Sequence, residues 1–249
     1  MSEAAFFDLD KTLMAGSSGM QFARIARRRG IVSRRQVVKW GRDHLRYRLK
    51  GATDEETVQL LRVARESIAE VSATEISRMW PEVLAGILPR IYPEMLAEVY
   101  RHQDAGRKVF IISAAGADMV GSLARVLGMD GGVGTRYLVN GDGVYTGEMD
   151  GPFVYGPGKV TAIKDLAREF DLDLDDSWAY SDSLSDLPML AAVGNPVAVN
   201  PDAGLLAEAK EHGWQVMRFE RLGRNLAVAG TVGGAILLGG LGSYLSRRR

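Results

Sequence analysis

The sequence of 249 residues contains no cysteine and only three histidines. Disulfides, zinc thiolate sites and cysteine nucleophiles are therefore excluded. Neither sign of charge is in excess, because 31 lysines and arginines balance 31 aspartates and glutamates. We therefore expect no nucleic-acid partner. The N-terminus lacks a basic segment followed by an apolar one, so the sequence predicts no secretory signal.

The apolar content of 46% and the charged content of 25% are ordinary for a globular protein. Short apolar runs predict β-strands at residues 4–8, 108–113, 132–137, 177–181, 196–200 and, more weakly, 214–219. Helix-like stretches lie between the later runs, at residues 116–127, 159–170, 184–192 and 203–212. This alternation predicts an α/β fold with a doubly wound, Rossmann-like parallel sheet.

Between the first two predicted strands the pattern changes to helical spacing. Apolar residues recur at Val58, Leu61, Ala64 and Ile68, and candidate N-caps are Ser33, Thr53 and Ser72. We predict a helical cap at residues 16–89, inserted into a core made of residues 1–15 and 90–220. A core helix is expected from about Glu94, and a small hairpin within residues 137–154.

Two segments have compositions typical of membrane contact. Residues 225–246 contain no charge, and as one helix they would span about 33 Å. We predict that residues 221–249 are an apolar membrane anchor; the alternative is a C-terminal helix packed on the core or on a partner. Residues 24–50 carry eleven lysines and arginines against one acid. This basic stretch fits either a solvated helix face or a surface for phosphate groups and anionic lipid heads.

The first candidate site residues are Asp8 and Asp10, which follow the apolar run that begins at Ala4. Ligands of open α/β sheets bind at the carboxyl ends of strands. Adjacent carboxylates are costly unless a cation or a shared proton relieves their repulsion. One carboxylate could attack phosphorus while the other transfers protons. A bare pair of aspartates in a surface turn is the alternative.

Ser113 and Lys159 are candidate phosphate ligands. Ser113 closes the second apolar run, where a hydroxyl and free N–H groups can hold phosphate oxygens; it could equally be an N-cap. Lys159 stands at the start of a predicted helix, where its charge opposes the helix dipole. Neutralising a phosphoryl group would explain that position. The alternative is an exposed lysine in the first turn.

Asp182 and Asp186 follow a further strand and lie four residues apart. Two more carboxylates at a strand end would complete a site of hard oxygen ligands for Mg²⁺. The alternative is a pair of acids favoured by the N-terminus of a helix.

Taken in order, these motifs resemble those of the haloacid dehalogenase-like (HAD) hydrolase superfamily. The segments 7–13 (Phe-Asp-Leu-Asp-Lys-Thr-Leu) and 181–188 (Ser-Asp-Ser-Leu-Ser-Asp-Leu-Pro) carry most of the resemblance, which covers about residues 4–219. More closely, the chain resembles the phosphoserine phosphatase-like subfamily IB. That resemblance implies a HAD core with a helical cap of the C1 type.

The resemblance also implies two-step phosphoryl transfer with Mg²⁺ as cofactor. Asp8 would form an aspartyl phosphate, and Asp10 would act as general acid and then as general base. Ser113 and Lys159 would hold the phosphoryl oxygens. The metal would be bound by Asp8, the Asp10 main-chain carbonyl and Asp182, with Thr12 and Asp186 in supporting positions.

The substrate expected from this pattern is a small or lipid-linked phosphate ester. Phosphoserine phosphatases carry a glutamate soon after the first motif, whereas residues 14–22 contain no acid. An arginine-rich cap suits a substrate with a further anionic group. The alternatives are a phosphoserine phosphatase, a phosphotransferase, and a non-catalytic membrane-tethered binding module. We expect a cytoplasmic catalytic domain, with membrane contact through residues 225–246 and the basic cap.

Overall fold

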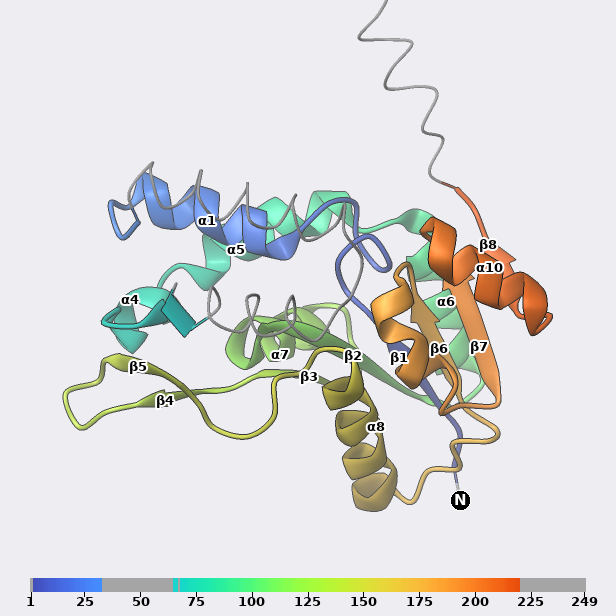
Figure 1. Ribbon diagram of the computed structural model, residues 1–249. Coiled ribbons are helices and arrows are strands. Elements are labelled where there is room, and N and C mark those ends of the chain that lie inside the picture. The colour runs from blue at the N-terminus through green and yellow to red at the C-terminus, as the bar shows by residue number, and fades with distance from the viewer. Residues whose placement is uncertain (1, 33–64, 67, 220–249) are drawn as a thin grey trace, which may run out of the picture. The chain divides into compact units, whose positions relative to one another are not determined.

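The computed structural model describes residues 2–32, 65–66 and 68–219. Its centre is a parallel sheet of six strands in the order β3-β2-β1-β6-β7-β8 (Figure 1). The strands are β1 (Ala4–Phe7), β2 (Lys108–Gly116), β3 (Gly131–Thr135), β6 (Trp178–Ser181), β7 (Asn195–Val199) and β8 (Gln215–Met217). The predicted doubly wound parallel sheet is therefore confirmed.

The strand order reverses between β1 and β6. From β1 the chain builds outward through β2 to β3, and from β6 it builds in the other direction through β7 to β8. In sheets of this kind ligands bind outside the carboxyl ends of the strands at such a switch point. The residues that follow β1 and β6 are thus placed at the sheet's natural ligand crevice.

Alternating side chains of β1 pack against helices on opposite faces of the sheet. Ala4 and Phe6 join an apolar cluster with residues of α8 (Pro157–Phe170), including Ile163. The ring of Phe7 points to the opposite face, where it contacts His102 of α6 (Pro93–Asp104) edge-on at 6.2 Å between ring centroids. All four β1 residues are buried, as expected for a central strand of a sheet covered on both faces.

The other core helices follow the predicted alternation. They are α7 (Ala117–Val126), a 3₁₀ turn η2 (Leu184–Asp186) leading into α9 (Leu187–Leu190), and α10 (Ala203–Glu211). The helix predicted over residues 184–192 is thus shorter than expected. Pro188 lies at the start of α9, where its missing N–H is tolerated, and the residues before it close a tighter 3₁₀ turn instead.

The described part of the inserted segment contains α1 (Ser18–Arg28), α4 (Ala73–Ser77), α5 (Trp80–Ile87) and the 3₁₀ turn η1 (Leu88–Arg90). Ser72 caps α4 by accepting a hydrogen bond from the Glu75 amide, as predicted. The predicted caps at Ser33 and Thr53 and the helical pattern at Val58, Leu61 and Ala64 lie outside the described residues.

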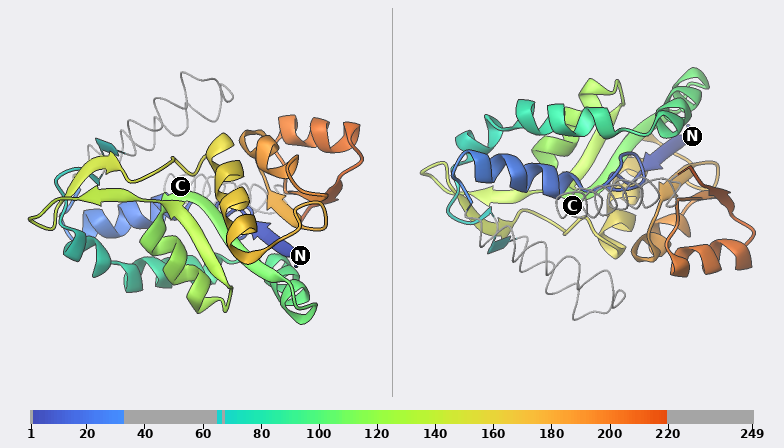
Figure 2. Two further views of the ribbon diagram at one scale, coloured as in Figure 1. Left: turned by 90° about the horizontal axis from the view of Figure 1, so that it is seen from below. Right: turned by 90° about the horizontal axis from the view of Figure 1, so that it is seen from above.

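The predicted hairpin is present as β4 (Tyr137–Val139) and β5 (Tyr145–Met149). It lies beside α4 in each view (Figures 1 and 2). Backbone hydrogen bonds join the two segments, because the Ala73 amide donates to the Gly143 carbonyl and the Tyr145 amide to the Val71 carbonyl. The hairpin is therefore tied to the inserted segment.

The two connections between the inserted segment and the sheet also pair with each other. The Ala15 amide donates to the Arg90 carbonyl at 2.7 Å, and the Tyr92 amide donates to the Leu13 carbonyl at 3.0 Å. These crossings follow directly after the first motif. They fix the backbone of η1 against the loop that carries Asp8 and Asp10.

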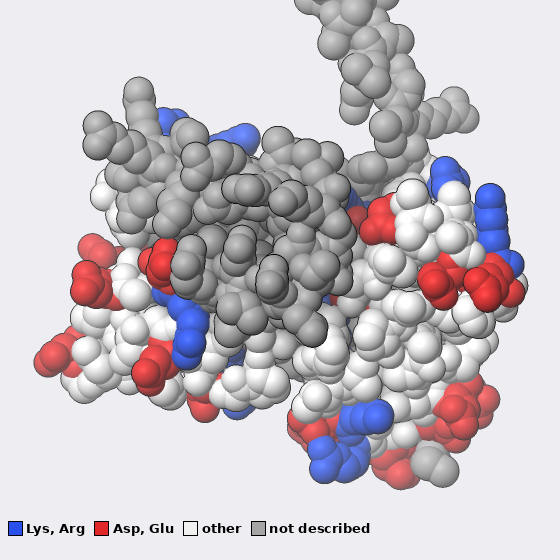
Figure 3. Space-filling model, in the orientation of Figure 1, with Lys and Arg blue, Asp and Glu red and all other residues white. Residues whose placement is uncertain are grey.

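None of the helices within the described ranges is long and apolar enough to cross a membrane. The predicted anchor at residues 225–246 and most of the basic stretch at 24–50 lie outside the described residues. On the face drawn in Figure 3, acidic and basic side chains are interspersed over the described surface.

Candidate active site

Asp8 and Asp182 lie at the carboxyl ends of two neighbouring strands, β1 and β6. Phe7 pairs with Tyr180, and the Asp8 amide donates to the Tyr180 carbonyl at 3.0 Å. Both aspartates are buried, with exposed fractions of 7% and 8%. A pair of aspartates in an exposed surface turn is therefore excluded for Asp8.

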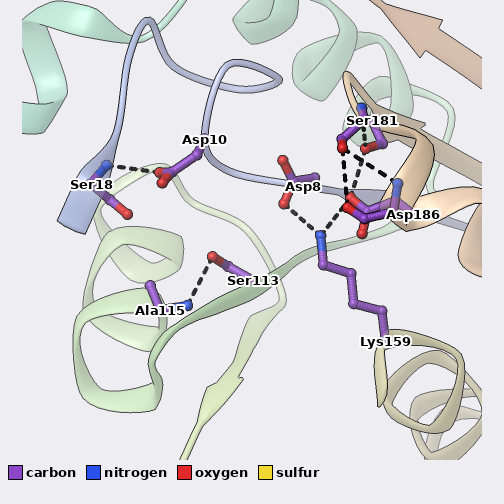
Figure 4. A network of polar contacts seen from close by, with 10 residues as sticks. Asp8, Asp10, Ser18, Ser113, Ala115, Lys159, Ser181 and Asp186 are labelled. Carbon is purple, nitrogen blue, oxygen red and sulfur yellow. Dashed lines mark hydrogen bonds and ion pairs between the residues drawn. The ribbon is translucent and has the colours of Figure 1, made fainter. Parts of the chain in front are cut away.

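Lys159 reaches from the first turn of α8 to both sides of this acidic site (Figure 4). Its Nζ donates to Asp8 Oδ1 at 2.6 Å and to Asp186 Oδ2 at 2.7 Å. Only 3% of its side chain is exposed, so the alternative of an exposed first-turn lysine is wrong. Burial opposes its charge, but attraction to Asp186 and Asp8 outweighs that cost and raises the pKa of Lys159.

Asp186 is held by a second hydrogen bond, from Ser181 Oγ at 2.6 Å. It occupies the N-cap position of α9, but its side chain makes no capping hydrogen bond there. Its other oxygen, Oδ1, is buried without a hydrogen-bond partner in the described structure. Ser181 is not among the residues predicted from the sequence for this site, although it ends the strand immediately before Asp182.

Asp10 points away from Lys159, toward the inserted segment (Figure 4). Its Oδ1 accepts a hydrogen bond from the Ser18 amide at 2.8 Å. Ser18 is the first residue of α1, and its N–H is one of the amides that a helix leaves unbonded at its N-terminus. Asp10 therefore links the sheet to the start of the cap. This contact could not be predicted from the sequence, because Ser18 contributes its backbone N–H rather than its side chain.

Ser113 is buried, and its Oγ accepts a hydrogen bond from the Ala115 amide at 3.2 Å. Contrary to the prediction, β2 does not end here but continues to Gly116 after a register shift against β3. The N-cap residue of α7 is Gly116, so Ser113 is not an N-cap. The Ser113 hydroxyl is therefore bonded to the backbone of its own strand, two residues further along.

Thr12 and Lys11 complete the first motif. Thr12 is fully buried and its Oγ1 has no hydrogen-bond partner within the described ranges. Lys11 has a left-handed backbone with φ of 64°, and its Nζ lies 3.6 Å from Asp182 Oδ2. The motif therefore also brings a cation beside Asp182, which the sequence analysis did not assign.

The carboxylates of the site repel one another. Burial raises the pKa of Asp8 to about 6; Lys159 opposes this shift and Asp186 adds to it. Burial also raises the pKa of Asp182 well above its usual value, and the charges of Asp8 and Asp186 add to that shift. A further positive charge placed between Asp8 and Asp182 would favour the ionised form of both groups.

Among the residues that the structure describes, no group of three or more His, Cys, Asp or Glu side chains is arranged to hold a metal. The smaller donor set of the site nevertheless fits Mg²⁺, because this ion needs few protein side chains. Mg²⁺ is commonly bound by one or two carboxylates, with water and substrate phosphate as the other ligands. Asp8 and Asp182 supply two buried carboxylates, and the main-chain carbonyl of Asp10 is the third expected protein ligand.

Comparison with known proteins gives the family. The model of the haloacid dehalogenase-like hydrolases matches residues 5–191. The chain belongs to this HAD family. The predicted resemblance is thereby confirmed, and the protein is a hydrolase with relatives named as phosphatases.

Three relatives cover most of the chain. The inhibition of morphological differentiation protein of Streptomyces azureus is 36% identical and covers 99% of this chain and 94% of its own. A probable phosphatase of Mycobacterium tuberculosis is 38% identical, over 88% of this chain and 76% of its own. A histidinol-phosphatase of Neisseria meningitidis is 32% identical, over 88% of this chain and all of its own.

Solved structures share the fold. A protein of unknown function from Bordetella pertussis superposes with a TM-score of 0.75 at 29% identity, over 87% of this chain and 98% of its own. A phospho-aspartyl intermediate analogue of a phosphoserine phosphatase superposes with a TM-score of 0.62 at 17% identity, over 88% of this chain and 94% of its own. At that identity the second likeness concerns the fold alone.

Proposed function

We propose that this HAD hydrolase is a Mg²⁺-dependent phosphatase that removes phosphate from a small-molecule monoester through an aspartyl phosphate on Asp8. The observation that carries the proposal is the buried cluster at the switch point, in which Lys159 bridges Asp8 and Asp186 beside Asp182. The likeness to phosphatases supports the same reaction class.

In the first step, an oxygen of Asp8 attacks phosphorus and the bond from phosphorus to the ester oxygen breaks. Lys159 holds Asp8 Oδ1, which leaves Oδ2 as the attacking atom. Asp10 gives its proton to the departing oxygen, so that an alcohol leaves rather than an alkoxide. Lys159 and Ser113 stabilise the charge on the phosphoryl oxygens.

In the second step, water attacks the phosphorus of the aspartyl phosphate and the bond to Asp8 breaks. Asp10, now ionised, takes a proton from that water, which restores both aspartates. Bound by Asp8, Asp182 and the Asp10 carbonyl, Mg²⁺ would lower the repulsion between the phosphate and the carboxylates. The hydrogen bond from the Ser18 amide holds the Asp10 carboxylate in place. From there it can protonate the departing ester oxygen in the first step and take a proton from the attacking water in the second.

Substrates of the relatives define the first compounds to test. Histidinol phosphate and phosphoserine are both amine-bearing monoesters of small alcohols, and a lipid-linked ester such as lysophosphatidate represents the other predicted class. Phosphate release should be measured with Mg²⁺ and with EDTA for the wild-type protein and for Asp8→Asn. Mg²⁺-dependent turnover that Asp8→Asn abolishes is expected; turnover retained by Asp8→Asn would refute the nucleophile assignment.

Transfer to an acceptor other than water is tested in the same assay. Added glycerol or ethanol should leave the yield of free phosphate unchanged for a phosphatase. Formation of a new phosphate ester would instead identify a phosphotransferase.

The domain boundaries and the membrane anchor belong to the same proposal. The paired connections at residues 13–15 and 90–92 support a cap that spans residues 16–89. The uncharged run at residues 225–246 supports a membrane anchor. A protein that ends at residue 222 should leave the membrane fraction to which the full chain binds; a full chain that never enters that fraction would refute the anchor.

A further inference from the structure

The side of the site from which the alcohol leaves is marked by Asp10. Its Oδ1 accepts a hydrogen bond from the Ser18 amide, and residues 11–17 form the loop between the two residues, called the rim below. Gly16 lies on this rim, is exposed, and has a left-handed backbone with φ of 85°. No acidic residue occurs in residues 14–22, so the rim itself offers no partner to a cation.

Arg90 lies beside this rim, on the second connection between the inserted segment and the sheet. Its backbone carbonyl accepts from the Ala15 amide at 2.7 Å, which fixes η1 beside the loop. A Cβ built on Gly16 would lie 4.0 Å from one terminal guanidinium nitrogen of Arg90, so the guanidinium lies against the glycine. The Arg90 side chain is exposed and forms no ion pair or hydrogen bond with another residue of the described chain.

The Arg90 guanidinium has no partner among the described residues, and the hydrogen bond from Ala15 holds its backbone in place. It is therefore suited to bind a ligand. Guanidinium binds carboxylate and phosphate groups with two parallel hydrogen bonds. The ester's phosphate is directed to Asp8 and Lys159, so the part of the substrate that reaches Arg90 is the remainder of the leaving alcohol. Two other cations near Asp8 already face acids: Lys159 bonds to Asp8 and Asp186, and Lys11 lies 3.6 Å from Asp182.

We infer that Arg90 is a specificity residue that binds an anionic group, a carboxylate or a second phosphate, on the alcohol portion of the substrate. This inference rests on the proposed phosphatase function and names the substrate class. It favours an ester that is anionic at both ends over one that carries an amine, which is the opposite charge preference from histidinol phosphate.

The test compares esters that differ in the charge of the alcohol. The compounds are 3-phosphoglycerate and ethylene glycol bisphosphate (anionic), glycerol phosphate (neutral) and phosphoethanolamine and histidinol phosphate (cationic). The variants are Arg90→Gln, Arg90→Lys and Arg90→Glu. Arg125→Gln is the matched control, because Arg125 is an exposed arginine on α7 whose side chain bonds to Ser122 and to no other described residue. Melting curves verify that each variant folds.

Arg90→Gln should lower kcat/KM for an anionic ester roughly tenfold to a hundredfold more than for glycerol phosphate, mainly through KM. The anionic ester that suffers this loss distinguishes a carboxylate from a phosphate ligand. Arg90→Lys should recover part of the loss, and Arg90→Glu should shift the preference further toward phosphoethanolamine. The Arg125→Gln control should match the wild type.

An equal change of kcat/KM for all esters, or no change for any, would overturn the inference while leaving the phosphatase function intact. If the wild-type protein hydrolyses none of the esters, the proposed function fails instead. Calorimetric titration of the unreacted esters would then still decide the role of Arg90. Equal affinities of wild type and Arg90→Gln for 3-phosphoglycerate and for ethylene glycol bisphosphate would overturn it.

Discussion

At the scale of single residues, three aspartates of the site lie in three different surroundings. Asp8 is ion-paired with Lys159 at 2.6 Å, Asp10 accepts from a backbone amide, and Asp182 is ion-paired with Lys11 at 3.6 Å. The protonation of a carboxylate follows from such neighbours rather than from residue type. Burial beside other acids keeps the pKa of Asp8 near 6 and that of Asp182 above its usual value.

His102 is a buried histidine outside the catalytic cluster. Its Nε2 lies 2.8 Å from the Tyr180 hydroxyl, which in turn donates to Glu98 at 2.9 Å. Because that hydroxyl hydrogen is used, His102 is the donor and its neutral Nε2–H tautomer fits. Burial, reinforced by the charges of Arg101 and Arg107, lowers the pKa of His102 to about 4.

This shift predicts a pH dependence of stability. Between pH 6.5 and about 4 the unfolded chain binds a proton that folded His102 does not, so stability is complete above pH 6.5 and falls as the pH is lowered. The contribution is about 3 kcal/mol at most. Urea unfolding at several pH values should show a smaller acid loss for His102→Gln than for the wild type. Parallel pH profiles would contradict a buried neutral His102.

At the scale of elements, the first turn of α8 sets the position of Lys159. A Cβ on Gly158 would lie 1.9 Å from the Phe153 carbonyl oxygen, so this glycine allows the helix to begin against the preceding loop. Tight backbone contacts of this kind are not visible in sequence spacing. The sequence did predict the helix and placed Lys159 at its start, because Gly-Pro-Gly precedes it.

Gly158→Ala should therefore displace the start of α8 and with it Lys159. We expect a loss of about 1–3 kcal/mol in the free energy of unfolding, as for other overpacked sites, together with a fall in kcat. Gly121→Ala is the matched control, because Gly121 lies inside α7 and a Cβ there meets no atom within 4 Å. That control should raise stability by about 0.5–1 kcal/mol. Similar changes in both variants would contradict the packing explanation.

At this scale the positions of the strands follow from the sequence, whereas strand ends and backbone contacts depend on the folded structure. The central strands were predictable because they are short apolar runs buried on both faces, as β1 is throughout and β2 is over most of its length. The end of β2 was predicted three residues early, since Ser113 resembles a strand end while the register shift depends on pairing with β3. The hydrogen bond from the Ser18 amide to Asp10 was not predictable, because every residue has a backbone amide.

At the scale of the whole molecule, the order of the strands brings distant motifs together. Asp8 and Asp182 are 174 positions apart in the chain, yet they follow neighbouring strands. Periodicity predicts strands but not their order. The carboxylates at strand ends suggested a common site, and the family resemblance assigned each of them a place in it. Arg90 was missed because it belongs to no motif, and only the crossing of the two cap connections brings it to Gly16.

A metal that relieves the repulsion between Asp8 and Asp182 should stabilise the whole fold. With Mg²⁺ at about one hundred times its Kd, the free energy of unfolding should rise by about 2.7 kcal/mol. For a chain of this size that corresponds to roughly 5–10 °C in Tm. EDTA should reverse the rise, and Asp182→Asn should remove it. Asp165→Asn, at an exposed ion pair with Arg168, is the control that should keep it. An equal rise in Asp182→Asn would contradict the predicted ligand set.

The most direct measurement is the capture of the phosphoryl group on the protein. In Asp10→Asn the first step still proceeds with p-nitrophenyl phosphate, whose leaving group needs little protonation, while the attack of water slows. Rapid quenching, borohydride reduction and peptide mass spectrometry should then find the modified residue at Asp8. Modification of a residue other than Asp8 would contradict a mechanism through this carboxylate. So would phosphate release in a single turnover without modification of Asp8.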